Sequence, residues 1–347
     1  MDKTYIIAEI GQNHNGDLNI AKQLIDAAAM TIKDESFDRT LHPINAIKLT
    51  KRDLSEELAF NEMQKTYNSK HSYGKTYFEH REALELSYEE HEELFYYAKS
   101  KNLDVIETLC SPKTLQLLDK VTPDYLKVAS RDLSNVPLLI ELGKTKIPII
   151  LSTGMSNLEE IEIAIETIEN FHSNISILHC LSQYPADYAN LNLFRIPELV
   201  RRYGSQYKIG YSDHSIGIMA PILSIGLGAQ IIEKHITLDH NMKGSDHKSA
   251  LEPDGLWRMT RDIRNAEASL GSSEIIESAF SKQAKEKLER SLAAKDDIPK
   301  NTILQEDMIV MLSPGTGLKW KDKNKILNKK TFCAIKKGEL FNDKMFE

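Results

Sequence analysis

The chain has little cysteine and no excess of basic charge. Its three cysteines, Cys110, Cys180 and Cys333, lie far apart and form no CxxC pair, which excludes a zinc finger and a scaffold built on disulfides. Lysine and arginine number 44 against 51 acidic residues, a net charge of -7. No broad basic face is expected, so a nucleic-acid or anionic-membrane partner is disfavoured. Any anionic ligand must be held by a few locally placed lysines.

Long apolar runs are also missing. No stretch approaches the ~20 apolar residues that span a membrane. The N-terminus runs into TYIIAEIG without the charged leader and apolar core of a signal peptide. We therefore expect a soluble, cytoplasmic protein with no membrane partner.

Short β-branched runs alternate with amphipathic helix-like segments along most of the chain. The expected strands are residues 5–11, 46–50, 104–109, 125–130, 147–153, 176–181, 208–213 and 230–237. The expected helices include residues 19–29, 87–101, 157–171, 194–203, 217–227 and 254–270. This alternation predicts an α/β fold, a closed (β/α)₈ TIM barrel. A doubly wound open sheet is the alternative, but GQNHNG lacks the GxGxxG spacing of that fold.

Polar side chains stand at the carboxyl end of nearly every expected strand. In a barrel these ends share one mouth, where active sites are built. Two lysines and several hydroxyls at this mouth form a candidate cradle for a phosphate and a carboxylate. The cradle comprises Lys48, Thr108, Lys127, Ser130, Ser152 and Ser212, and Glu9 and Ser182 stand at further strand ends.

Two strands end in histidine, His214 in YSDH and His235 in IEKH. Parallel strands would bring both imidazoles to one mouth, where they could share a divalent metal. Carboxylates that could serve as ligands or acid–base groups surround them, namely Asp213, Glu233, Asp239 and Asp246. Because His240 and His247 are also near, the spacing does not decide which pair binds. A strand-end histidine bonded to a backbone group is the alternative for each.

Residues 51–85 form a long polar insertion after the second expected strand. A loop of this length in a compact domain is typical of a functional lid. Its candidates for substrate contact are Lys75, Glu79, His80 and Arg81, although solvated helix residues are the alternative for each.

The composition changes after Gly271. We predict a barrel domain at residues 1–271, a charged linker at 272–289 and a small β-rich domain at 290–347, with turns at Pro299, Pro314 and Gly338.

Motifs along nearly the whole chain resemble the sialic acid synthase family of nonulosonic acid synthases, which carry a C-terminal antifreeze-like (SAF) domain. The matching motifs are AEIGQNHNGD at 8–17, LKVAS at 126–130, PIILSTGM at 148–155, LHC and YP within 178–185, YSDHS at 211–215, EKHIT at 233–237, DHKSALEPD at 246–254, RSLAAKDDI at 290–298 and SPGTG at 313–317.

The resemblance implies condensation of phosphoenolpyruvate with the open-chain aldehyde of a hexose derivative, giving a 3-deoxy-2-keto sugar acid and phosphate. It implies Mn²⁺, or else Mg²⁺ or Co²⁺, on His214 and His235. The residues implied for phosphoenolpyruvate are Lys48, Thr108, Lys127, Ser130, Ser152, Ser182 and Ser212. Those implied for the sugar are Glu9, Tyr184 and Asp246, and the catalytic candidates are Glu9, Asp132 and Asp246.

Departures from the family pattern bear on the substrate. Ser313 stands where relatives that take N-acetylated sugars have an arginine that reaches a partner's barrel. Serine cannot span that distance or offer forked donors. Ser182 replaces an asparagine and Asp132 a glutamate. The acceptor is therefore expected to differ from N-acetylmannosamine.

By the same resemblance we expect a domain-swapped homodimer. A metal-dependent pyruvate aldolase or lyase on the same barrel is the alternative reaction, and only the synthase releases phosphate from phosphoenolpyruvate.

Overall fold

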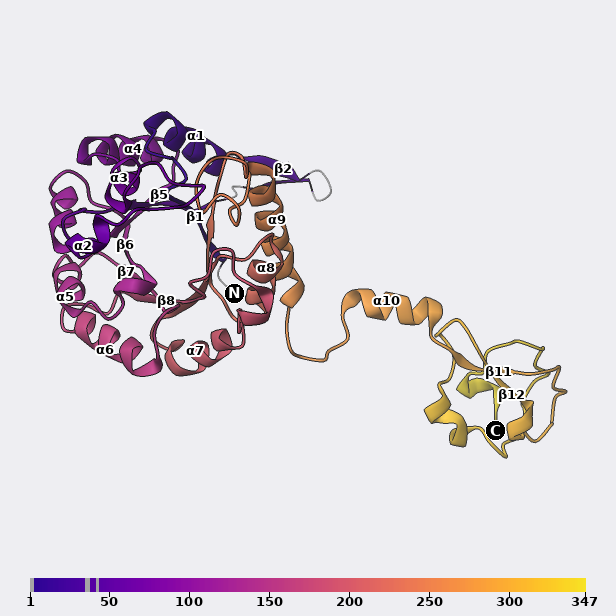
Figure 1. Cartoon of the computed structure of the whole chain (residues 1–347). Helices are drawn as coiled ribbons and strands as arrows, with labels where there is room; N and C mark the ends of the chain where they lie inside the picture. The colour runs from indigo at the N-terminus through magenta and orange to yellow at the C-terminus, as the bar shows by residue number, and fades with distance from the viewer. Residues whose placement is uncertain (1–2, 35–37, 42–43) are drawn as a thin grey trace. The chain divides into compact units, whose positions relative to one another are not determined.

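The computed structural model describes residues 3–34, 38–41 and 44–347. The chain divides into two compact units, Met1–Gly271 and Ser272–Glu347. In the first unit a ring of helices surrounds a barrel of strands (Figure 1). In the described part of the chain, every helix is too short or too polar to cross a lipid bilayer.

The barrel is closed and wholly parallel, which confirms the predicted TIM barrel. Its strands follow the order β1-β10-β9-β8-β7-β6-β5-β4, and β4 pairs with β1. They are β1 Tyr5–Gly11, β4 Ala46–Lys51, β5 Asp104–Leu109, β6 Tyr125–Val128, β7 Ile149–Ser152, β8 Ile175–Cys180, β9 Lys208–Asp213 and β10 Ile231–His235.

The helices outside the barrel begin at residues that cap them. Ser87 and Asn157 each form a capping box with a glutamate three residues later, which satisfies backbone N–H groups that the first turn leaves free. The helices of the first unit are α1 Leu18–Ala28, α2 Phe60–Met63, α3 Tyr77–Glu82, α4 Tyr88–Ser100, α5 Val136–Lys144, α6 Leu158–Glu169, α7 Arg195–Tyr203, α8 Met219–Gly226 and α9 Pro253–Leu270. Between β5 and β6 the connection is a 3₁₀ segment, Pro112–Asp119, in place of an α-helix.

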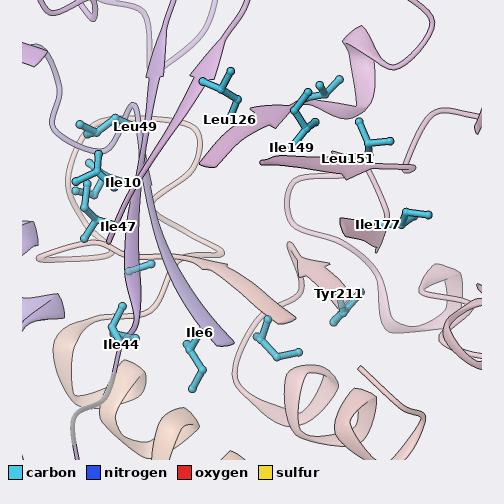
Figure 2. Close-up of a cluster of buried hydrophobic side chains, with 14 of the residues drawn as sticks. Ile6, Ile10, Ile44, Ile47, Leu49, Leu126, Ile149, Leu151, Ile177 and Tyr211 are labelled. Carbon is cyan, nitrogen blue, oxygen red and sulfur yellow. The ribbon is translucent and has the colours of Figure 1, made fainter. Parts of the chain in front are cut away.

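The main core fills the layer between strands and helices. Figure 2 shows some of its side chains, including Ile6 and Ile10 of β1 and Ile47 and Leu49 of β4, all fully buried. A smaller apolar cluster contains the strand residues Ile7, Ala46, Ile106, Ile150, Leu178 and Ile231.

The smaller apolar cluster shows which strand residues face the inside of the barrel, and so which polar residues face inward. Successive strand side chains alternate between faces, so residues two apart share a face. Ile7 therefore shares its face with Glu9, and Ile150 shares its face with Ser152. The inward face of the barrel is apolar at one end and polar at the carboxyl end of the strands.

Two features of the first unit were not predicted from the sequence. A two-stranded antiparallel sheet pairs β2 (Ile32–Asp34) with β3 (Arg39–Leu41). The insertion after β4 contains the short helices α2 and α3, and the Tyr73 hydroxyl donates a hydrogen bond to the Lys243 carbonyl. The insertion is thus attached to the segment that follows β10.

The second unit contains α10 (Ala279–Leu288) and a two-stranded antiparallel sheet of β11 (Ser291–Ala294) and β12 (Ile309–Leu312). Short 3₁₀ segments and isolated bridges complete it. Its own apolar cluster includes Leu292, Leu304 and Phe341, all fully buried.

Candidate active site

A polar pocket of about 340 Å³ opens at the carboxyl ends of the strands. It brings together every residue to which the family resemblance assigned a role, except Asp132. The predicted residues that line it are Glu9, Lys48, Thr108, Lys127, Ser130, Ser152, Ser182, Tyr184, Ser212, His214, His235 and Asp246.

The two cradle lysines are buried and already face hydroxyl groups. Lys127 Nζ donates to Ser152 Oγ at 2.5 Å, and Lys48 Nζ lies 3.4 Å from Thr108 Oγ1. Burial lowers the pKa of Lys127, although the nearby Glu233 carboxylate opposes that shift. Ammonium groups with so little water around them suit a strongly anionic ligand.

Gly154 permits three side chains to converge beside the lysines. A Cβ at this position would lie 2.6 Å from Ser182 Oγ, 2.9 Å from Ser130 Oγ and 3.1 Å from Cys180 Sγ. The Ser130 hydroxyl accepts a hydrogen bond from the Gly154 amide at 3.0 Å. The glycine therefore leaves room for closely spaced hydroxyls on one wall.

Two buried carboxylates accompany the lysines. Lys48 Nζ lies 2.7 Å from Glu9 Oε2 and 3.8 Å from Glu233 Oε1, and Ser212 Oγ donates to Glu233 at 2.9 Å. Burial raises the pKa of Glu9, and Lys48 only partly offsets this. Burial also acts to raise the pKa of Glu233, but Lys127 and Lys48 outweigh it, so the pKa falls. The two carboxyls thus differ in proton affinity, as acid–base partners do.

The two strand-end histidines are neighbours. Their ring centroids lie 5.5 Å apart, and the Tyr184 ring is 4.0 Å from that of His214. His214 Nδ1 donates to the Leu181 carbonyl at 2.8 Å, so Nε2 is the nitrogen that faces away from this backbone contact. His235 Nδ1 is buried without a hydrogen-bond partner, and burial lowers the pKa of His235 to about 4.

These histidines have the chemistry of metal ligands, because His214 uses only Nδ1 for its backbone hydrogen bond and His235 Nδ1 is buried without a partner. In the part of the chain that the structure describes, no three His, Cys, Asp or Glu side chains are grouped closely enough to bind an ion by themselves. A metal on His214 and His235 would therefore depend on substrate or water oxygens for its other ligands.

The other acidic and histidine candidates are engaged elsewhere. Asp213 pairs with the fully buried Lys234 at 2.5 Å. His247 Nδ1 lies 2.7 Å from Thr237 Oγ1, and His240 lies 3.0 Å from Glu252. The pocket lining does not include Asp213, His240 or His247.

Asp246 lies in a hydrogen-bonded chain at the pocket wall. Gln12 Nε2 donates to Asp246 Oδ2 at 3.1 Å, and Arg81 Nη1 donates to Gln12 Oε1 at 2.7 Å. Burial acts to raise the pKa of Asp246, but His235, Ser245 and Gln12 outweigh it and the pKa falls. The carboxylate stays ionised and oriented.

Asp132 does not line this pocket. Its carboxylate lies 3.3 Å from Arg131 Nε and faces an adjoining pocket that Glu57 also lines. Burial raises the pKa of Asp132, and Arg131 only partly opposes it. Arg131 and Cys110 line both pockets. The Arg131 side chain therefore lies between the Asp132 carboxylate and the main site.

Of the four insertion candidates, only Arg81 lines the pocket. Glu79 accepts from the Lys75 amide at 2.5 Å and caps α3. His80 is buried and stacks on Tyr67 with ring centroids 4.6 Å apart. These contacts stabilise the insertion, and Lys75, Glu79 and His80 do not line the pocket.

Several lining residues had no predicted role. They are Gln12, Arg52, Cys110, Arg131 and Cys180. Glu233, one of the carboxylates expected beside the histidines, does line the pocket, since it lies two residues before His235 on the same face. No comparable periodic signal marks Arg52 and Arg131, which follow their strands.

A closed parallel barrel with a polar, partly basic pocket at its carboxyl ends defines a TIM-barrel enzyme. The chain belongs to the NeuB family, whose model matches residues 41–275, and an SAF domain matches residues 289–347. The family and the antifreeze-like domain expected from the motifs are thereby confirmed.

Relatives match the chain over nearly its full length. It is 33% identical to N,N'-diacetyllegionaminic acid synthase of Legionella pneumophila, covering 96% of this chain and 92% of the relative. It is 32% identical to human N-acetylneuraminate-9-phosphate synthase, covering 99% and 92%. The crystal structure of N-acetylneuraminic acid synthetase from Leptospira borgpetersenii, a citrate complex, is 30% identical with a TM-score of 0.68, covering 82% of this chain and 90% of that one.

Proposed function

We propose that the protein condenses phosphoenolpyruvate with the open-chain aldehyde of a hexose derivative, giving a 3-deoxy-2-keto sugar acid and inorganic phosphate. The named relatives are nonulosonic acid synthases. The observation that carries the proposal is the buried contact of Lys127 with Ser152 beside Lys48. Two ammonium groups and a wall of hydroxyls suit a small ligand with both a phosphate and a carboxylate.

Phosphoenolpyruvate would occupy the inner end of the pocket. Lys48 and Lys127 neutralise its charge, and the hydroxyls of Ser130 and Ser152 donate hydrogen bonds to its oxygens. The Ser212 hydroxyl, which donates to Glu233, would turn to the ligand. The remaining members of this set are Thr108 and Ser182. Removing such an anion from water is favourable only when every oxygen finds a donor.

A divalent ion, Mn²⁺ or else Mg²⁺ or Co²⁺, would be held by His214 and His235 and would supply Lewis-acid polarisation of the aldehyde oxygen. Tyr184, whose ring lies 4.0 Å from that of His214, would pack against the sugar. Asp246, fixed by Gln12, would accept hydrogen bonds from its hydroxyls.

The reaction forms one carbon–carbon bond and breaks one carbon–oxygen bond. The alkene carbon of phosphoenolpyruvate attacks the aldehyde carbon, which leaves positive charge at C2. Water adds to C2, and the hemiketal phosphate then loses phosphate to give the keto acid. Glu9, whose pKa is raised by burial, is the group we assign to proton transfer at the new hydroxyl. Asp132 would assist from the adjoining pocket.

The acceptor is proposed to be a sugar other than N-acetylmannosamine. Ser313, where relatives have arginine, donates its hydroxyl to the Leu288 carbonyl of its own unit at 2.8 Å. A side chain of this length cannot act at a distant acyl amide. A wide preference for N-acetylmannosamine in steady-state kinetics would contradict this part of the proposal.

We further propose a domain-swapped homodimer that works in the cytoplasm. Light scattering at working concentrations tests the assembly, and a monomer alone would contradict it.

Phosphate release from phosphoenolpyruvate tests the reaction itself. The assay contains Mn²⁺ and a panel of aldoses, namely N-acetylmannosamine, mannose, the diacetamido sugars of the legionaminic and pseudaminic routes, and aldose phosphates. Release that requires one acceptor is the expected result. Condensation from pyruvate without phosphate release would instead indicate the metal-dependent aldolase or lyase.

A further inference from the structure

Three arginines converge on one carboxylate beside the pocket. Arg131 Nη1 lies 2.9 Å from Glu57 Oε1, Arg52 Nε 3.5 Å from Glu57 Oε2, and Arg81 Nε 3.8 Å from Glu57 Oε1. The Glu57 side chain is only 1% exposed, whereas all three arginines line the pocket. The buried Glu57 carboxylate therefore pairs with three guanidinium groups that all line the pocket.

These arginines form a second basic layer, outside the lysines. Arg52 comes four residues after Lys48, and Arg131 comes four residues after Lys127, in each case beyond the inward lysine of the strand. Arg52 directly follows β4, and Arg131 lies in the 3₁₀ segment Ser130–Asp132 that follows β6. A molecule as small as phosphoenolpyruvate bound at the lysines does not need this layer.

The arginines retain donors that no protein group uses. Arg52 donates from Nη1 to Glu85 at 3.1 Å, and its buried Nε faces Glu57 Oε2 at 3.5 Å, so its remaining donors are on the two Nη atoms. Arg81 donates from Nε to Tyr77 and from Nη1 to Gln12. Since a guanidinium carries five N–H donors, each of these two has donors to spare.

The arginine layer adjoins the residues assigned to the acceptor sugar. Arg81 contacts Gln12, and Gln12 donates to Asp246. The pocket lining carries five lysine and arginine side chains, Lys48, Arg52, Arg81, Lys127 and Arg131, against three carboxylates, Glu9, Glu233 and Asp246. Outside that lining, Glu57, Glu85 and Asp132 pair with the arginines, as Glu9 and Glu233 pair with the lysines. The arginines therefore offer a ligand forked N–H donors rather than surplus charge.

We propose that Arg52, Arg81 and Arg131 bind an anionic group, a phosphate or a carboxylate, on the acceptor aldose at a carbon remote from its aldehyde. The inference rests on the proposed function and deepens it, because it names the class of acceptor. Forked guanidinium donors match the oxygens of such groups, whereas a neutral hydroxyl gains little from them.

The competing explanation is that the arginines only brace the segment around Glu57 against the barrel. The two explanations differ in kinetics. A brace affects all acceptors alike, whereas an anion site discriminates between a charged acceptor and its neutral counterpart.

The experiment compares matched acceptors with wild-type protein and the Arg81→Gln variant. The probes are mannose and N-acetylmannosamine, their 6-phosphates and their 6-carboxylates. Wild-type kcat/KM is expected to be about tenfold or more higher for one charged form, which distinguishes phosphate from carboxylate. Arg81→Gln is expected to remove most of that advantage without changing the KM for phosphoenolpyruvate. Arg201→Gln, in an exposed arginine of α7, is the matched control and should change nothing.

Calorimetric titration of the same 6-phosphates and 6-carboxylates supplies a readout that does not need turnover. Their Kd is expected to rise about tenfold in Arg81→Gln and in Arg131→Gln, with circular dichroism confirming the fold. Equal kcat/KM for charged and neutral acceptors, or equal losses on both in Arg81→Gln, would overturn the anion site while leaving the synthase reaction intact. Absence of phosphate release with every acceptor would instead overturn the proposed function, and the titration would still decide the anion site.

Discussion

Lys48 Nζ lies 2.7 Å from Glu9 Oε2, and both side chains are almost fully buried at neighbouring strand ends. Strands β1 and β4 close the barrel, and their register places Glu9 opposite Lys48. A buried pair of this kind contributes little to stability by itself, because desolvation offsets the attraction. Its position in a polar pocket agrees with the ligand-binding and proton-transfer roles proposed for these two residues.

Replacing Ser152 by alanine should weaken phosphoenolpyruvate binding. The change removes the hydroxyl that Lys127 contacts at 2.5 Å, and a hydrogen bond to a charged group contributes about 1.5–3 kcal/mol. The KM for phosphoenolpyruvate is expected to rise about tenfold or more in a phosphate-release assay. Ser269→Ala, at an exposed serine of α9, is the control. An unchanged KM in Ser152→Ala would contradict the assignment of this wall.

Gly154→Ala should also weaken phosphoenolpyruvate binding, because the added methyl group would collide with the serine hydroxyls. The added methyl would lie 2.6 Å from Ser182 Oγ and 2.9 Å from Ser130 Oγ, so at least one hydroxyl must move. We expect a KM increase of about tenfold for phosphoenolpyruvate and little change in KM for the acceptor. Gly226→Ala is the matched control, since a Cβ there meets nothing within 4 Å. If both variants bind phosphoenolpyruvate like the wild type, the hydroxyl wall is not part of the site.

Removal of divalent metal should abolish turnover if His214 and His235 hold an ion. A chelator is expected to reduce phosphate release by about 100-fold or more, and added Mn²⁺ to restore it, because Lewis-acid polarisation lowers a barrier by several kcal/mol. His214→Ala should lose both activity and Mn²⁺ binding measured by electron paramagnetic resonance. His240→Ala, at a histidine outside the pocket, should keep both. Full activity of His214→Ala would contradict the metal assignment.

Acid should destabilise the barrel through His14. Burial lowers the pKa of this histidine from 6.5 to about 3, so the folded state keeps it neutral while the unfolded state takes up a proton. Its contribution is therefore complete above pH ~6.5 and is lost as the pH falls towards ~3. Between pH 7.5 and 5.0 the loss should reach about 2 kcal/mol.

Urea unfolding of the wild type and of His14→Gln at both pH values measures that contribution. The variant should be less stable at pH 7.5, because its amide replaces a ring nitrogen that accepts from the Gly16 amide at 3.0 Å. It should nevertheless lose less stability on acidification. Equal losses in the two proteins would rule His14 out as the titrating group.

The sequence predicted the barrel because its strands carry a repeated, strongly apolar pattern. β1, β5 and β9 have the predicted bounds, since Gly, Asp and Asn residues interrupt the chain at their ends. The short β2–β3 sheet was missed because three-residue strands carry no measurable period. The 3₁₀ segment Pro112–Asp119 stands between β5 and β6 in place of an α-helix. Its initial proline does not mark it, since α9 also begins with a proline.

The amino-acid sequence by itself determined the family, the barrel and most of the residues that line the pocket, because strand alternation fixes which side chains share a face. Tertiary structure alone decided how those side chains are paired. It set the opposite pKa shifts of Glu9 and Glu233, because Glu233 lies near both lysines and accepts from Ser212, whereas Glu9 pairs with Lys48. It placed Asp132 in the adjoining pocket and gathered Arg52, Arg81 and Arg131 around Glu57. Contacts between loops that follow different strands depend on the closure of the barrel, and no local pattern of residues encodes them.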